Sequence, residues 1–240
     1  MRSRRFRYWY GNLRFRWYSL VGSDEGIQSK NSIENTSIHN LKALKNLKTD
    51  FNMPRMNWLI HAVLALEKVN KRSRILSIGA RTENEILLLH ALGFNSITAI
   101  DLQSYSPLIQ VGDMHKLGFP VGTFDVVFCG WAISYSRTPK VAAKEILRVT
   151  KSGGIIAIGL EHVPNLVQAR KEAIKRKDPL WEALQKRVNS CRDILMLFGR
   201  KNIRHVYFKH DFPLSRLKAE EIYRITGLHS SQVMCVFEKS

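Results

Sequence analysis

Apolar runs of strand length alternate with helix-like segments through the middle of the chain. The runs occupy residues 75–78, 97–100, 108–111, 124–129 and 155–160. Strands that are apolar on both faces and alternate with helices are typical of a parallel sheet covered by helices on both sides. The pattern therefore predicts an α/β fold with ligands at the carboxyl ends of the strands.

Further elements flank this pattern. A helix at 57–69 leads into the first strand, and another helix begins at Thr138-Pro139. Residues 165–198 are helical and basic. Two closing strands are expected at 204–209 and 232–237, with a short helix between them. The polar residues 23–50 predict a linker with one short helix.

The segment Arg74–Asp101 forms the first half of a nucleotide-cofactor site. Its first strand ends at Gly79, and the T-x-x-E spacing of Thr82 and Glu85 predicts a capping box at the start of a helix. Asp101 closes the second strand, 22 residues after Gly79. In doubly wound folds, an acid at about that distance can accept hydrogen bonds from the ribose hydroxyls of a cofactor.

The turn after Gly79 lacks the other glycines of a dinucleotide site. A pyrophosphate needs close backbone approach, and Glu83 and Glu85 would repel it. S-adenosylmethionine has no phosphate and carries a cationic sulfonium, so the loop suits this cofactor better. Arg81 is a candidate partner for its carboxylate. In the alternative, Arg81 pairs with one of the glutamates, which then only complement the helix dipole.

Five motifs follow one another in the middle of the chain. They are SIGARTENE (77–85), AID (99–101), VGDMHKLGF (111–119), FDVVFCGWAISYS (124–136) and EILRVTKSGG (145–154). Together they resemble the class I S-adenosylmethionine-dependent methyltransferases, most closely the methyltransferase type 11 group. The resemblance covers about residues 73–162. It implies a Rossmann-like, mostly parallel sheet with an antiparallel C-terminal strand, methyltransferase activity, and S-adenosylmethionine as cofactor.

The resemblance also implies roles for residues at the strand ends. Asp101 would bind the ribose hydroxyls, and Asp113 the adenine amino group. Met114 would pack on the adenine ring, while Gly130 and Trp131 would line the methyl-donor pocket.

The first motif departs from the family pattern D/E-x-G-x-G-x-G. Ser77 stands in place of the acid, and Arg81 and Glu83 replace the second and third glycines after Gly79. We expect a variant loop in which Gly79 and Arg81 still contact the donor. The alternative is a non-catalytic relative.

Cysteine spacing and hydropathy indicate which kinds of site and segment the chain lacks. The three cysteines are Cys129, Cys191 and Cys235, whose spacing fits neither a metal site nor a disulfide framework, so we expect a reducing compartment and no metal. The longest apolar stretch, near residues 58–66, is far too short to span a bilayer.

The net charge of +18 is concentrated outside the cofactor core. Residues 1–72 carry a net charge of +9, residues 73–162 of +1, and residues 163–240 of +8. Such basic flanks favour an anionic partner, such as a charged glycan, a nucleic acid or a lipid surface. A solvated basic surface without a specific partner is the alternative.

The N-terminal segment has aromatic and basic residues on both sides of Gly11-Asn12, a turn signal that predicts a β-hairpin. In that register Tyr10 faces Leu13, Tyr8 faces Phe15, Phe6 faces Trp17, and Arg7 meets Arg16. Such a hairpin could dock on the domain, bind nucleic acid or lie at a membrane interface. An Arg-rich, acid-free start also suits a mitochondrial targeting segment, which the alternation disfavours because such a segment needs an amphipathic helix.

Catalytic residues are not evident from spacing. Candidates for a base near the strand ends are Tyr135, Glu161 and His162, with His115 and the pair His210-Asp211 less favoured. Each could equally have a structural role.

These patterns predict a basic aromatic extension and linker (1–50) followed by a methyltransferase-like domain (51–240). Within that domain the cofactor core is 73–162 and the basic acceptor side is 163–240. We expect transfer of a methyl group to an anionic or sugar-containing acceptor, in a cytoplasmic protein that can touch a membrane, or in a mitochondrial one. A non-catalytic protein that binds RNA or an anionic membrane is the rival interpretation.

Overall fold

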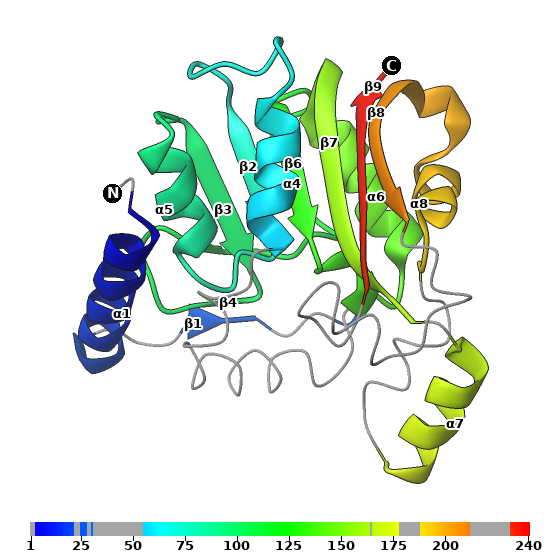
Figure 1. Ribbon diagram of the computed structural model, residues 1–240, viewed down its shortest axis with the longest axis horizontal. Coiled ribbons are helices and arrows are strands. Elements are labelled where there is room, and N and C mark those ends of the chain that lie inside the picture. The colour runs from blue at the N-terminus through cyan, green and yellow to red at the C-terminus, as the bar shows by residue number, and fades with distance from the viewer. Residues whose placement is uncertain are drawn as a thin grey trace.

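The computed structural model describes residues 3–21, 25–27, 30, 55–163, 165–177, 188–211 and 231–240. A central sheet has the strand order β5-β3-β2-β6-β7-β9-β8 (Figure 1). In that order its strands are Gln110–Val111, Ile97–Asp101, Ile75–Ile78, Phe124–Gly130, Thr150–His162, Ser231–Lys239 and Ile203–Asp211. The first five are parallel, whereas β9 runs antiparallel to both β7 and β8. The predicted fold class is confirmed.

Helices cover both faces of this sheet. They are α4 (Arg55–Leu64), α5 (Asn84–Ala91), α6 (Pro139–Val149) and α8 (Cys191–Phe198). Alternate residues of β6 point to opposite faces, so Val126 and Phe128 pack with α4, while Val127 and Cys129 pack with α6 and α8. Helix α7 (Leu166–Lys175) protrudes beyond the carboxyl edge of the sheet (Figure 1).

The strands lie where the sequence predicts them, but the ends of two helices differ from the prediction. Helix α5 begins at Asn84, and its N-cap Glu83 makes no side-chain capping bond. The capping box is therefore wrong: the Glu85 carboxylate accepts a hydrogen bond from Ser77 instead of bonding back to the main chain of Thr82. Helix α4 ends at Leu64, five residues before the predicted boundary. A tertiary partner has replaced the local one in the case of Glu85.

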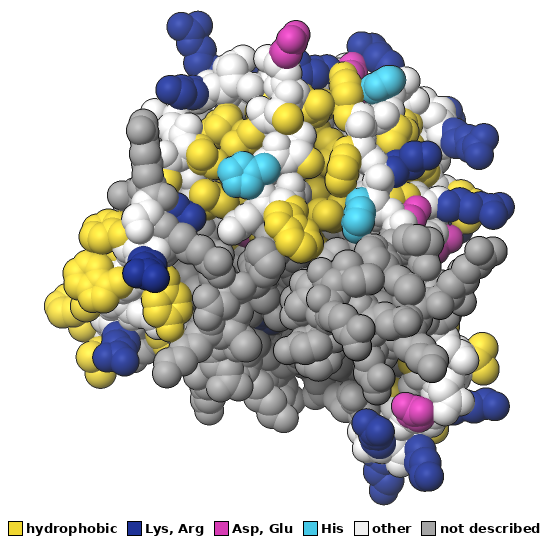
Figure 2. Space-filling model, viewed as in Figure 1, with side chains coloured by type: hydrophobic (Ala, Val, Ile, Leu, Met, Phe, Trp, Pro, Cys, Tyr) yellow, Lys and Arg dark blue, Asp and Glu magenta, His cyan; other side chains and the backbone are white. Residues whose placement is uncertain are grey.

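The N-terminal hairpin is wrong, because Arg4–Val21 forms one helix, α1. The Asn12 side chain donates to the Tyr8 carbonyl at 2.8 Å, one turn earlier, where the hairpin required a reversal. Helix α1 lies beside α5, with hydrophobic and basic side chains on its outer surface (Figures 1 and 2). The alternation therefore no longer disfavours a targeting segment, since Arg4–Val21 is an amphipathic helix.

Several predicted segments have a different or undescribed form. Glu25–Gly26 forms β1, paired antiparallel with β4 (Gln103–Ser104), where only a linker was expected. Only 25–27 and 30 of the predicted linker at 23–50, in which one short helix was expected, are described. The short helix expected between β8 and β9 lies outside the described residues, as does 178–187 of the predicted helical segment. His210 and Asp211 end β8, two residues beyond the predicted strand boundary.

Candidate functional site

The carboxyl ends of β2, β3, β5 and β6 meet at one edge of the sheet. Ile78 lies beside Ile100 and Cys129 in the parallel register, and Asp101 lies beside Val111. The predicted site residues follow directly after these positions. They are Gly79 and Arg81 after β2, Asp101 at the end of β3, Asp113 and Met114 after β5, and Gly130 and Trp131 at the end of β6. The topology thus brings the predicted donor site together.

Gly79 turns the chain sharply at the end of β2. Its φ is +78°, and a Cβ at this position would lie 2.5 Å from the Cβ of Ala132, so no other residue fits. The Gly79 amide donates to the Ile100 carbonyl at 2.8 Å. The loop after β2 is therefore packed between the end of β3 and the segment that follows β6.

Trp131 turns the chain at the end of β6. Its φ of +59° places a bulky side chain in the left-handed region, where such residues are rare. Two contacts with Gly159 stabilise this conformation. The Trp131 amide donates a hydrogen bond to the Gly159 carbonyl at 2.7 Å. The indole also packs so closely on Gly159 that a Cβ at that position would lie 2.7 Å from the ring. Strained residues that persist cluster at functional sites, which agrees with the predicted place of Trp131 in the donor pocket.

A second carboxylate accompanies Asp101 at this edge. The Ser77 hydroxyl at the end of β2 donates to Glu85 on α5, and Asp101 at the end of β3 is 6% exposed. Burial raises the pKa of Glu85 to about 7, the Ser77 hydrogen bond opposes that rise, and the nearby Asp101 charge adds to it. The carboxylates of half-buried Glu85 and buried Asp101 therefore lie close enough for their charges to interact, which suits a cation.

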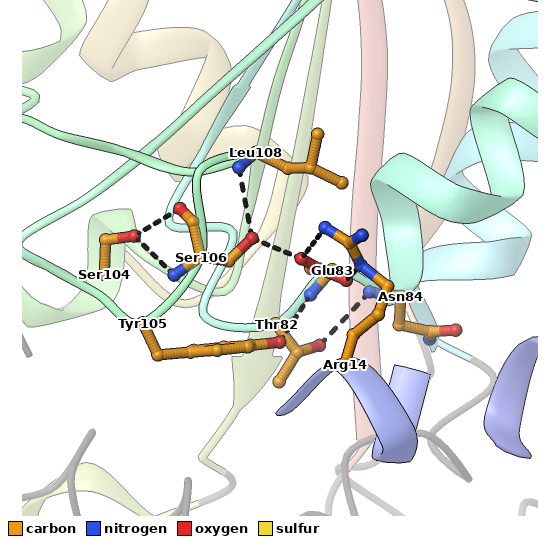
Figure 3. A network of polar contacts seen from close by, with 8 residues as sticks. All are labelled: Arg14, Thr82, Glu83, Asn84, Ser104, Tyr105, Ser106 and Leu108. Atoms are coloured by element: carbon orange, nitrogen blue, oxygen red, sulfur yellow. Dashed lines mark hydrogen bonds and ion pairs between the residues drawn. The ribbon is translucent and has the colours of Figure 1, made fainter. Parts of the chain in front are cut away.

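Glu83 has a different environment from Glu85, although the two are almost adjacent in sequence. Its carboxylate is fully buried and accepts from Arg14 of α1 twice, from Nε at 2.6 Å and from Nη2 at 2.8 Å (Figure 3). The Ser106 hydroxyl also donates to it. This ion pair raises the pKa of Arg14. Glu83 therefore fastens the N-terminal helix to the cofactor loop, in addition to any effect on the helix dipole.

Arg14 is the residue of this region that sequence reasoning missed. Arg14 and Glu83 lie 69 residues apart, and no local pattern connects them. The Phe15 ring packs edge-on against Tyr105, with centroids 4.9 Å apart, and the Tyr105 hydroxyl accepts from the Glu83 amide at 3.2 Å. One clue was available, since Glu83 occupies a family glycine position and an acid in a tight loop requires a partner.

His115 holds Asp113 in place. Its ring is fully buried, with Nδ1 2.5 Å from Asp113 Oδ1 and Nε2 2.6 Å from Ser136 Oγ. Because both ring nitrogens have partners within the protein, His115 positions the Asp113 carboxylate relative to Ser136. It ties the loop after β5 to the segment that follows β6.

The other candidate bases lie after β6 and at the end of β7. Tyr135 ends the short 3-10 helix η1 (Ile133–Tyr135), and Glu161 and His162 end β7. His162 Nδ1 lies 2.9 Å from the Asn189 carbonyl oxygen, which can only accept, so this nitrogen carries a proton.

Two structural features bear on metals and membranes. Over the described ranges, no group of three or more His, Cys, Asp or Glu side chains is arranged to hold a metal ion. None of the helices in the same ranges is both long and apolar enough to cross a membrane.

Comparison with known proteins gives a family match over part of the chain. Residues 76–158 match the family described as methyltransferase domain, the type 11 group. No curated protein sequence matches the chain.

Solved structures share the fold at low identity. A putative sarcosine dimethylglycine methyltransferase from Galdieria sulphuraria is 15% identical, with a TM-score of 0.58 over 95% of this chain and 97% of that one. Geranyl diphosphate C-methyltransferase from Streptomyces coelicolor, solved with S-adenosyl-L-homocysteine, is 12% identical, with a TM-score of 0.56 over 96% and 98%. The [4+2]-cyclase SpnF is 13% identical, with a TM-score of 0.55 over 96% and 94%. These likenesses show the fold, and the family match supports the predicted activity and cofactor.

Proposed function

We propose that this chain transfers a methyl group from S-adenosylmethionine to an anionic or sugar-containing acceptor, because residues 76–158 match a methyltransferase domain. Binding of the methyl donor is supported by the two carboxylates, Glu85 and Asp101, which lie beside a loop that is unsuited to a pyrophosphate. The anionic character of the acceptor is inferred from the basic residues 1–72 and 163–240, which flank a nearly neutral cofactor core.

The residues at the strand ends fit the chemical groups of the donor. Asp101 accepts from the ribose hydroxyls, Asp113 and Met114 bind the adenine, and Gly130 and Trp131 line the methyl-donor pocket. Gly79 permits close approach, and Arg81 pairs with the donor carboxylate. To this predicted set we add Glu85, whose carboxylate beside Asp101 complements the positive charge of the sulfonium and ammonium groups. Bound S-adenosylmethionine supplies the electrophilic methyl group.

The chain's own contribution to transfer is alignment of the acceptor and exclusion of water. A hydroxyl acceptor also requires a group that removes its proton, and Tyr135, Glu161 and His162 are the candidates at this edge of the sheet. We assign the acceptor side to residues 163–240 and the cofactor core to 73–162, within a domain that spans 51–240. Residues 1–50 form the extension, and the location remains either cytoplasmic or mitochondrial in this proposal.

The rival function is a non-catalytic protein that binds RNA or an anionic membrane through its basic flanks. Two observations favour it: the first motif is altered at Ser77, Arg81 and Glu83, and the [4+2]-cyclase SpnF has the same fold and a name that denotes another reaction.

Calorimetric titration of the folded chain with S-adenosylhomocysteine distinguishes the two. We expect saturable binding, and about ten- to a hundredfold weaker binding by Asp101→Ala, because charge-assisted hydrogen bonds to the ribose are lost. Glu172→Ala, on the exposed surface of α7, is the matched control and should bind normally. Absence of binding by the folded parent chain, together with salt-sensitive RNA or vesicle binding, would establish the rival function.

A further inference from the structure

Helix α1 presents a row of large apolar side chains to solvent. Their spacings of three and four residues place them on one side of the helix. The exposed fractions are 44% for Phe6, 58% for Trp9, 51% for Leu13, 61% for Trp17 and 84% for Leu20. We call these five residues the α1 stripe. The outer surface of α1 is correspondingly hydrophobic in Figure 2.

The opposite side of α1 is fixed to the domain. Gly11 and Arg7 are buried, Arg14 forms the bidentate ion pair with Glu83, and Phe15 packs on Tyr105. A buried, paired carboxylate strongly favours one orientation of the helix, because separation would leave the charge of Glu83 without its cation. The stripe therefore faces outward as a consequence of the fold.

The charge of α1 suits an anionic surface. No acidic residue occurs between Met1 and Val21, whereas Arg5 and Arg16 are exposed on one border of the stripe. Tryptophan and phenylalanine prefer the boundary between headgroups and acyl chains, leucine enters the acyl region, and arginine reaches the phosphates. All three kinds of side chain are present in the geometry of a helix that lies in the plane of a membrane surface.

We propose that α1 binds the surface of an anionic lipid bilayer through the α1 stripe, with its arginines at the lipid phosphates. RNA is a poorer fit, because Leu13 and Leu20 offer nothing to stacked bases. A second copy of the chain is also a poorer fit, because apposed stripes would bring the arginines that border them together. Since Arg14 and Glu83 connect α1 to the loop after β2, bilayer binding places the donor site at the lipid surface.

The test is sedimentation of the full chain with large unilamellar vesicles of phosphatidylcholine, with and without phosphatidylglycerol. We expect binding only to the anionic vesicles, reduced by salt. The double variant Trp9→Gln with Trp17→Gln should bind at least about tenfold more weakly, because two exposed aromatic side chains no longer insert. Val167→Gln with Met196→Gln removes side chains of similar exposure, 67% and 57%, from α7 and α8, and should bind like the parent.

Three outcomes would overturn the proposal. The first is equal binding by the tryptophan variant and the parent. The second is binding to single-stranded RNA, lost in the tryptophan variant, without binding to vesicles. The third is a dimer in solution that this variant dissociates, again without vesicle binding. Phe6→Gln with Leu13→Gln provides an independent variant of the stripe, and circular dichroism verifies that each variant retains its fold.

Discussion

Replacement of Glu85 by glutamine tests the electrostatics of the candidate donor site. Glutamine keeps the shape of the side chain and can still accept the hydrogen bond from Ser77, but it carries no charge beside Asp101. The pKa of Glu85 is raised from 4.5 to about 7, which corresponds to about 3 kcal/mol at most.

The sign of the effect on stability follows from proton binding. The unfolded chain releases this proton near pH 4.5, whereas the folded chain keeps it until about pH 7. Stability therefore falls as the pH rises through this window, and the whole loss is present above it. Glu85→Gln should raise the free energy of unfolding by up to about 3 kcal/mol at pH 8, and by little at pH 4.5.

The same substitution should have the opposite effect on donor binding. A cationic ligand favours ionised Glu85, so the affinity of the parent chain for S-adenosylhomocysteine, which keeps the ammonium group, should increase as the pH rises to about 7. Glu85→Gln should abolish that increase and weaken binding at pH 8 about tenfold, since one charge-assisted contact is lost. General damage to the fold would lower both stability and ligand affinity, whereas Glu85→Gln should raise the first and lower the second.

Urea unfolding followed by circular dichroism, from pH 4.5 to 8, measures the first effect, and calorimetry over the same range measures the second. Glu83→Gln is the matched control. It should destabilise the chain at every pH in the range, because Arg14 loses its carboxylate partner. The reasoning is refuted if Glu85→Gln destabilises the protein at pH 8, or if it leaves the pH dependence of ligand affinity unchanged.

Two further substitutions probe the loop after β2. Arg14→Met should lower the free energy of unfolding, measured with urea, by about 3 kcal/mol, because the fully buried Glu83 carboxylate loses its cation. Adding Glu83→Gln should recover part of this loss. If the effects of the two substitutions on stability simply add, Arg14 and Glu83 are not paired. Gly79→Ala should cost more than about 1–3 kcal/mol in the same assay and weaken S-adenosylhomocysteine binding, because alanine is strained at a φ of +78° and its Cβ would also lie 2.5 Å from the Cβ of Ala132. An unchanged midpoint would contradict both constraints.

The central sheet could be predicted from sequence because its strands carry their own signal. β2 and β6 are apolar on both faces, so the short runs at 75–78 and 124–129 identified them without knowledge of their neighbours. The order of the strand ends then placed Asp101 near the loop at Gly79, since parallel strands bring their carboxyl ends to one edge.

The N-terminal helix could not be predicted in this way. Gly11-Asn12 is a strong local turn signal, and aromatic residues alternate with others on both sides of it. The same residues also satisfy the spacing of a helix. Contacts with residues distant in the sequence favour the helix over the hairpin, because α1 buries Gly11 and forms the ion pair between Arg14 and Glu83. Helix stability in proteins comes mainly from such packing and not from local propensity.

The altered first motif is better explained as a rearranged loop than as a decayed one. The family pattern has an acid at the position of Ser77, and here the hydroxyl of Ser77 binds the carboxylate of Glu85, so a carboxylate is still present at the end of β2. Glu83, at a family glycine position, has acquired Arg14 as its partner. Both glutamates therefore have defined structural positions in the loop.

An exchange of the two positions tests this interpretation. Adding Ser77→Asp to Glu85→Gln returns the carboxylate to the strand and keeps the number of charges at the site unchanged. We expect the double variant to recover most of the S-adenosylhomocysteine affinity lost in Glu85→Gln. Ser77→Asp alone should be destabilising above about pH 7, because it adds a third carboxylate beside Glu85 and Asp101. If calorimetry shows no recovery in a folded double variant, the carboxylate of Glu85 does not replace the family acid, and its pairing with Ser77 is structural.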